Sequence, residues 1–146
     1  MEHSYAYLMY RTVRLLRRDF LRLAHSVGLD VYPEQWFILQ KLNQHGALSQ
    51  NELGDRLIMD KPSLSRTMKT LVDRDWVRRK ADIEDGRKWQ ITLTHKGEQV
   101  VAVLMKAVKR ERSHMFSDLS ESDFIVFQKI IASITEKAQR NLKQQG

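Results

Sequence analysis

The amino-acid sequence predicts a mainly α-helical fold with one small β-hairpin, in the order α-α-α-α-β-β-α-α. Two observations support this prediction. Apolar residues recur every three or four positions in long segments at both ends of the chain, as they do along one face of an amphipathic helix. Two short segments with alternating apolar residues flank the turn dipeptide Asp85-Gly86, which is typical of a β-hairpin.

The first two helices are predicted from apolar spacing and from their end signals. Apolar residues keep the helical spacing from Tyr5 to Val27, and Gly28 ends the pattern. Pro33 begins the second helix, because proline is favoured in a first helical turn, and Gly46 ends it.

Two shorter helices follow, each with a recognisable start. Ser49 and Glu52 have the spacing of a capping box at the start of a helix from Gln50 to Leu57. The tripeptide Asp60-Lys61-Pro62 begins the fourth helix. The inward residues of the fourth helix are Leu64, Met68 and Leu71.

The hairpin and the last two helices complete the prediction. The hairpin strands are expected from Trp76 to Ala81 and from Trp89 to Leu93. Thr94 is expected to cap the fifth helix. Ser120 and Asp123 resemble a capping box at the start of the sixth helix.

Composition limits the classes of function. The chain has 146 residues, with 25 Lys or Arg against 18 Asp or Glu, a formal charge of +7 and no cysteine. The lack of cysteine excludes disulfides, cysteine-ligated zinc, thiol catalysis and thiol-based sensing of oxidants. The longest apolar run, Val100 to Met105, is too short to span a bilayer, and the N-terminus has no signal-peptide pattern. We therefore expect a soluble cytoplasmic protein that does not enter a membrane.

Positive charge is concentrated where the fourth helix and the hairpin meet. Residues 61–80 contain seven Lys or Arg and two Asp. A short helix, a tight turn and a second helix with small polar and basic residues outward predict a helix-turn-helix, and the following hairpin with a basic tip makes it a winged helix. A helix of about 10–12 Å diameter fits the major groove of DNA.

Helix geometry and charge select the candidate DNA contacts. Small side chains at Ser63 and Ser65 allow close approach, Arg66 reaches base edges or phosphates, and Arg87 at the hairpin tip suits a narrow minor groove. Weaker candidates, selected only for their position and charge, are Lys61, Lys69, Thr70 and Lys88.

The terminal helices carry more apolar surface than a winged helix needs. The economical explanation is a homodimer in which these helices pack against a second copy; a monomer with a helical cap is the alternative. We therefore divide the chain into a helical dimerisation region, residues 1–30 and 95–146, and a winged helix-turn-helix region, residues 31–94. Such a dimer presents two recognition helices about 34 Å apart to DNA half-sites.

Three stretches resemble the MarR family of transcriptional regulators. They are Leu48–Leu53, Pro62–Arg66 and Asp85–Thr94. The sharpest element is Asp-x-Arg in the hairpin, followed six residues after the Arg by Leu-Thr. The resemblance implies a homodimer that binds a palindromic operator in double-stranded DNA, usually as a repressor, and that a small aromatic or phenolic effector releases.

The resemblance also assigns residues. It implies that Ser63, Ser65 and Arg66 face DNA from the recognition helix. It implies that the carboxylate of Asp85 orients Arg87 for the minor groove. Gly54 is a departure, since the family more often has alanine there.

Other functions are less well supported by the residues. A winged helix used for protein–protein assembly needs an apolar patch on the outward face of the fourth helix, where polar residues lie. A regulator that responds to no ligand also stays open. No catalytic or phosphate-loop motif occurs, so we expect no enzyme.

No metal, cofactor or effector residue is assigned. Glu111-x-x-His114 is a single copy of a motif that forms di-metal sites only in pairs, and Glu111 is expected to meet an arginine of the first helix instead. The expected metal and cofactor content is therefore none. The effector site stays unassigned, because Tyr32 and Trp36 are most simply interpreted as core.

Overall fold

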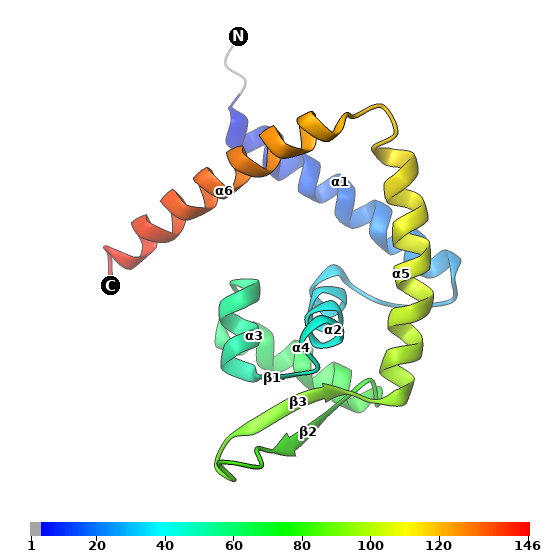
Figure 1. The fold of residues 1–146 in the computed structure, drawn as a ribbon, viewed down its shortest axis with the longest axis vertical. Helices are drawn as coiled ribbons and strands as arrows, with labels where there is room; N and C mark the ends of the chain where they lie inside the picture. The colour runs from blue at the N-terminus through cyan, green and yellow to red at the C-terminus, as the bar shows by residue number, and fades with distance from the viewer. Residues whose placement is uncertain (1–3) are drawn as a thin grey trace. The chain divides into compact units, whose positions relative to one another are not determined.

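The computed structural model describes residues 4–146 (Figure 1). The chain divides into two compact units, Met1–Arg110 and Glu111–Gly146, which are described separately. In chain order the elements are α1 (Tyr5–Ser26), α2 (Pro33–His45), β1 (Ala47–Ser49), α3 (Gln50–Leu57), α4 (Lys61–Asp73), β2 (Val77–Ala81), β3 (Trp89–Leu93), α5 (His95–Met115) and α6 (Glu121–Lys143).

The predicted fold class is confirmed, with one strand added. The hairpin of β2 and β3 forms as expected, and Figure 1 shows it extending away from α2, α3 and α4. The additional strand β1 pairs antiparallel with β3, with Leu48 opposite Ile91, so the sheet has the order β1-β3-β2. The predicted order α-α-α-α-β-β-α-α lacked this strand, because a three-residue strand before a helix cap is too short to show alternation.

The predicted helix caps are confirmed by their hydrogen bonds. Ser49 Oγ accepts from the Glu52 backbone N–H at 3.1 Å, and the Glu52 carboxylate accepts from the Ser49 N–H at 3.3 Å. At the start of α4, the Asp60 carboxylate accepts from the Ser63 N–H at 3.0 Å. Hydrogen bonding to Ser63 lowers the pKa of Asp60 below its ordinary value. These caps fix the first turns of α3 and α4, the two helices of the helix-turn-helix.

The core of the first unit lies between α2, α3, α4, the sheet and the first turns of α5. Its largest fully buried side chains are Ile38, Leu39, Leu42, Leu53, Met68, Leu71, Ile91, Leu104, Val31 and Val77. Trp36 is also buried, 3% exposed, and stacks on Phe20 with ring centroids 6.4 Å apart. The interpretation of Trp36 as core is confirmed. The same interpretation of Tyr32 is wrong, because that side chain is 44% exposed.

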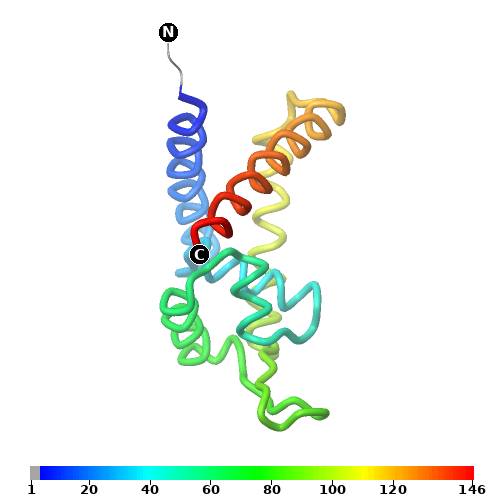
Figure 2. Tube along the Cα trace, turned by 90° about the vertical axis from the view of Figure 1, so that its left-hand side faces the viewer, coloured from blue at the N-terminus to red at the C-terminus, as the bar shows by residue number. Residues whose placement is uncertain are grey.

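The exit of the hairpin is tied to its entry by close backbone packing. The Thr94 N–H donates to the Trp76 carbonyl at 3.1 Å, and Thr94 Oγ1 accepts from the Gly97 N–H at 3.0 Å, which confirms Thr94 as a cap of α5. A Cβ atom at Gly97 would lie 2.0 Å from the Trp76 carbonyl oxygen. Glycine is therefore required for α5 to begin this close to β2. Figure 2 follows the chain from α4 through the hairpin into α5.

The second unit consists of the end of α5, a turn and α6. The Asp123 carboxylate accepts from the Ser120 N–H at 2.8 Å, as expected for a capping box with Asp in place of Glu. Phe116 and Phe124 pack edge to face with ring centroids 5.6 Å apart. None of the residues of α6 is buried. Among the residues that the structure describes, no helix is long and apolar enough to cross a membrane.

Candidate nucleic-acid interface

The recognition helix α4 presents one polar face away from the core. Its buried residues Leu64, Met68 and Leu71 hold the opposite side against α2 and α3. The exposed residues on the outward side include Lys61, Pro62, Ser65, Arg66 and Lys69, whereas Ser63 and Thr70 are half-buried. The structure therefore places six of the candidates, including three of the weaker ones, on or beside a single face.

Hydrogen bonds within α4 hold two of these side chains in place. Arg66 Nη2 donates to Ser63 Oγ at 3.2 Å, and Thr70 Oγ1 donates to the Arg66 carbonyl at 3.3 Å. Lys69 pairs with Asp73 at 2.9 Å, and both side chains are well exposed. An exposed pair of this kind contributes at most about 1 kcal/mol, so a phosphate can replace Asp73 as the partner of Lys69.

The tip of the hairpin, hereafter the wing, is organised by Asp82. Its Oδ1 accepts from the Glu84 N–H at 2.8 Å, and its Oδ2 accepts from Gln90 Nε2 at 3.1 Å. The Glu84 hydrogen bond is the main reason that the pKa of Asp82 lies below its ordinary value. The Asp82 N–H also donates to the Lys88 carbonyl at 2.8 Å, which closes the base of the loop. Asp82 therefore links Glu84, Gln90 and Lys88 through hydrogen bonds at the base of the wing.

Asp85 acts on the backbone of the wing arginine. The Asp85 carboxylate accepts from the Arg87 backbone N–H at 3.1 Å, and the Asp85 carbonyl accepts from the Lys88 N–H at 3.0 Å. The Arg87 guanidinium forms no ion pair with any of residues 4–146, and its residue is exposed. Asp85 thus fixes where the Arg87 side chain leaves the backbone, and the charged group itself stays available.

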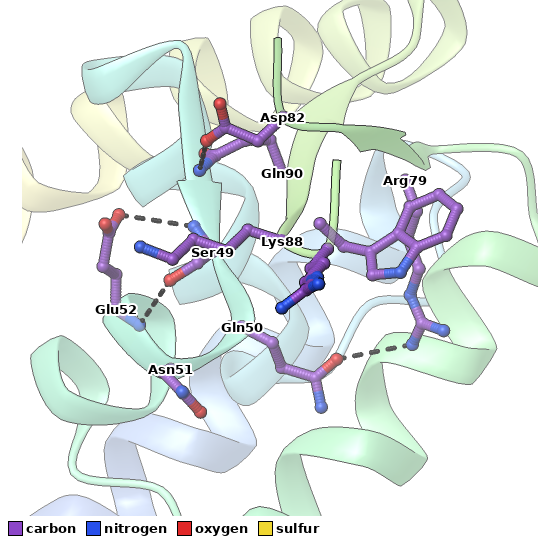
Figure 3. Close-up of a pocket in the computed structure, with 10 residues that line it drawn as sticks. Ser49, Gln50, Asn51, Glu52, Arg79, Asp82, Lys88 and Gln90 are labelled. Atoms are coloured by element: carbon purple, nitrogen blue, oxygen red, sulfur yellow. Dashed lines mark hydrogen bonds between the residues drawn. The ribbon is translucent and has the colours of Figure 1, made fainter. Parts of the chain in front are cut away.

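A groove of about 940 Å³ separates the wing from the start of α3 (Figure 3). Figure 3 shows Gln50 and Asn51 from the start of α3 together with Arg79 and Lys88 from the hairpin, with a hydrogen bond from Arg79 to Gln50. The groove's lining also includes Trp89, whose residue is 57% exposed.

Sequence reasoning missed three residues that organise this surface: Gln50, Arg79 and Asp82. Asp82 had a usable signal, because Asp at the first position of a turn commonly accepts from backbone N–H groups two and three residues later. Gln50 and Arg79 had none. Their contact joins residues 29 positions apart, which no local pattern reveals.

The fold and this surface together define a winged helix-turn-helix protein. Residues 31–89 match the model of the MarR family. An uncharacterised HTH-type transcriptional regulator of Staphylococcus aureus is 28% identical over 95 residues, which cover 64% of this chain and 65% of that relative. Over residues 31–89 the chain is accordingly similar to the MarR family, as its motifs suggested.

Two solved structures share the fold. The Staphylococcus aureus protein MepR, in a DNA complex, matches with a TM-score of 0.83 at 20% identity and covers 92% of this chain and 96% of its own. The Streptomyces coelicolor regulator PcaV, with its natural ligand, matches with a TM-score of 0.79 at 20% identity, covering 93% of this chain and 94% of that chain. At this level of identity the likeness concerns the fold alone.

Proposed function

We propose that this chain is a dimeric, sequence-specific DNA-binding regulator of transcription. The observation that supports it best is the outward face of α4, where Ser65 and Arg66 are exposed on a helix held by buried residues. The hairpin follows α4 directly in the chain, and the carboxylates of Asp82 and Asp85 accept backbone hydrogen bonds within the wing. In the proposed complex α4 enters the major groove and Arg87 enters the neighbouring minor groove.

The proposed contacts to bases and the proposed contacts to phosphates contribute differently to DNA binding. Arg66 has the length and donor geometry to bind guanine O6 and N7, whereas the small Ser63 and Ser65 let the helix backbone approach the base edges. Lys61, Lys69, Thr70 and Lys88 are proposed to bind phosphates, which supply affinity without sequence information. Sequence preference therefore comes mainly from α4 and from the shape of the minor groove at Arg87.

Dimer formation is proposed from the exposed apolar residues of α6. Phe127, Ile130 and Ile134 follow helical spacing and are all exposed. A contiguous apolar face of this kind on a soluble protein marks an association surface. A second copy is the economical partner, because a two-fold dimer would then bind an inverted repeat with one α4 in each half-site.

We further propose that the protein is a repressor released by a small effector. A second, smaller hollow of about 220 Å³ is lined by Tyr32, Glu34, Gln35, Arg66, Thr67 and Thr70. Arg66 lines the hollow and also lies on the proposed DNA face. An occupant that binds the Arg66 guanidinium would therefore compete with DNA.

The rival function, a winged helix for protein–protein assembly, has weaker support. It needs an apolar surface on α4, but Lys61, Ser65, Arg66 and Lys69 are the exposed residues there. The other alternative is a DNA-binding regulator that responds to no effector. It would bind DNA in the same way, but no compound in the small hollow would change its affinity for DNA.

Selection from a library of randomised DNA duplexes tests the main proposal. We expect the wild-type protein to enrich an inverted repeat whose half-sites lie about one helical turn apart, and to bind it with two chains per duplex. Failure to enrich any sequence would overturn sequence-specific binding. Enrichment of a single half-site with one chain bound would overturn the dimer.

Thermal unfolding in the presence of phenolic compounds tests the effector proposal. A compound that binds the folded chain raises its melting temperature, and the same compound should release the selected duplex. Release should be lost in Tyr32→Ala if the compound lies in the small hollow, since Tyr32 lines the hollow and is no proposed DNA contact. A binding compound that leaves DNA affinity unchanged would contradict the proposed release.

A further inference from the structure

Gln50 connects the recognition helix α4 to β2, the strand that leads into the wing. Its Nε2 donates to Ser65 Oγ on α4 at 3.1 Å, and its Oε1 accepts from Arg79 Nη2 on β2 at 3.4 Å. Figure 3 shows the second of these hydrogen bonds at the side of the large groove. One side chain at the first position of α3 therefore touches α4, which carries proposed DNA contacts, and β2, which leads into the wing.

Arg79 determines which way the Gln50 amide faces. A guanidinium has only donors, so the end of the amide next to Arg79 must be the carbonyl oxygen. The amino end then faces Ser65, and an amino group can only donate. The Ser65 oxygen is therefore an acceptor in this contact, and its hydroxyl proton is not used by Gln50.

The Ser65 proton is not used by its own helix either. Thr67 and Thr70 on α4 donate their hydroxyl protons to carbonyls one turn earlier, at 2.9 and 3.3 Å. Ser65 forms no such bond, and no acceptor among the described residues takes its proton. Because Ser65 is exposed on the outward face of α4, the proton is available to a group outside the chain.

We propose that Gln50 is a positioning residue that holds Ser65 as a hydrogen-bond donor toward DNA. This inference rests on the proposed function, because it needs α4 to meet a duplex. Ser65 would then bind an acceptor, either a phosphate oxygen or a base acceptor such as guanine O6, and would disfavour an exocyclic amino group at the same place. The direction of one hydroxyl would thus contribute to what the recognition helix accepts.

The substitution Gln50→Glu reverses the hydroxyl while keeping the side chain's length. A carboxylate can accept from Arg79 and also from Ser65, so the Ser65 proton turns inward. The variant also adds a negative charge near DNA, which weakens binding by itself. Asn51→Asp is the matched control, because it makes the same charge change at the next residue and in the same groove, without a bond to Ser65.

The measurement is the affinity of each variant for the duplex that wild-type protein enriches. Loss of one hydrogen bond to DNA corresponds to about 1.4 kcal/mol, or about tenfold in affinity. We expect Gln50→Glu to bind about tenfold more weakly than Asn51→Asp. In a Ser65→Ala background the two variants should bind equally. If Gln50→Glu and Asn51→Asp bind the duplex equally well with Ser65 present, as well as in the Ser65→Ala background, the proposed positioning of Ser65 by Gln50 is overturned.

A second duplex of unrelated sequence identifies the acceptor. A loss confined to the enriched duplex assigns the Ser65 proton to a base, and an equal loss on both duplexes assigns it to a phosphate. Either result supports the donor role. If wild-type protein binds neither duplex, the proposed function fails, and the proposed role of Gln50 fails with it. If wild-type protein binds the enriched duplex and Ser65→Ala does not weaken that binding, only the proposed role of Gln50 and Ser65 fails.

A measurement without DNA separates positioning from folding. The side-chain amide of Gln50 gives its own pair of NMR signals, and we expect both to shift in Ser65→Ala, while the denaturation midpoint in urea stays close to wild type. Unchanged Gln50 signals would show that the amide does not face Ser65 in solution, which would overturn the inference.

Discussion

Gly97 is the position where the structure predicts the largest cost for adding a single methyl group. A Cβ atom there would lie 2.0 Å from the Trp76 carbonyl oxygen and 2.9 Å from the Trp76 carbonyl carbon. Both atoms belong to the backbone, so no side-chain rotation relieves the overlap. The same carbonyl accepts from the Thr94 N–H, which ties it to the start of α5.

The magnitude follows from the displacement that Gly97→Ala requires. Moving the oxygen to ordinary van der Waals distance needs a shift of more than about 1 Å in a hydrogen-bonded backbone, and overpacking of this kind costs about 1–3 kcal/mol, occasionally more. Alanine offsets part of it, since helix propensity favours Ala over Gly by about 1 kcal/mol. Because both overlapping atoms are backbone atoms, we take the upper end of the overpacking range and expect a net loss of about 2 kcal/mol in the free energy of unfolding.

Gly54 is the matched comparison within α3. A Cβ atom there would lie 3.4 Å from Leu64 Cδ2 and 3.5 Å from the Met59 carbonyl oxygen, which are ordinary contacts. Gly54→Ala should therefore stabilise the protein by about 0.5–1 kcal/mol through helix propensity. Urea denaturation followed by far-ultraviolet circular dichroism measures both variants. A Gly97→Ala protein as stable as wild type, or two variants with equal losses, would refute the reasoning.

Three further predictions concern the cap of α4, the wing and α6. Since hydrogen bonding lowers the pKa of Asp60 in the folded state, its stabilising contribution is present above the unfolded value near 3.8 and is lost as pH falls through the lower folded value. Asp60→Asn keeps the cap without the titration, so the difference in urea midpoint between wild type and this variant should change below about pH 4; a difference independent of pH would contradict this. Trp89 is the exposed tryptophan, whereas the other two are buried at 3% and 7%, so acrylamide should quench mainly Trp89, and bound duplex should protect it. Quenching that survives in Trp89→Phe would place the accessible indole elsewhere. Ile130→Glu should convert a dimer to a monomer in sedimentation experiments and weaken duplex binding; an unchanged mass would exclude this part of α6 from the interface.

Local signals in the sequence predicted most of the fold. The α3 bounds, Gln50–Leu57, and the β3 bounds, Trp89–Leu93, agree with the structure residue for residue. Both elements are defined by short-range chemistry, a capping box in one and alternation after a turn in the other. The strand β1 was missed because its pairing with β3 is a long-range feature.

The candidate site was only partly predictable for a similar reason. Ser65, Arg66 and Arg87 could be selected from helix geometry and family resemblance, and the structure places them at exposed positions. Gln50 and Arg79 depend on how α3 is placed against β2. Periodicity shows which face of a helix points inward, but it does not show which polar groups on separate elements meet.

The salt dependence of duplex binding tests the central claim most directly. Each phosphate contact contributes about 0.9 to the slope of log affinity against log salt, with affinity falling as salt rises. We predict that Lys88→Ala, which removes a proposed phosphate contact of the wing, lowers this slope by about one, and that Arg66→Ala weakens binding to the enriched duplex more than to an unrelated duplex. Arg18→Ala, an equal loss of charge on an exposed position of α1, should change neither quantity. If all three variants behave alike, the charge of the chain as a whole, and not α4 and the wing, binds DNA.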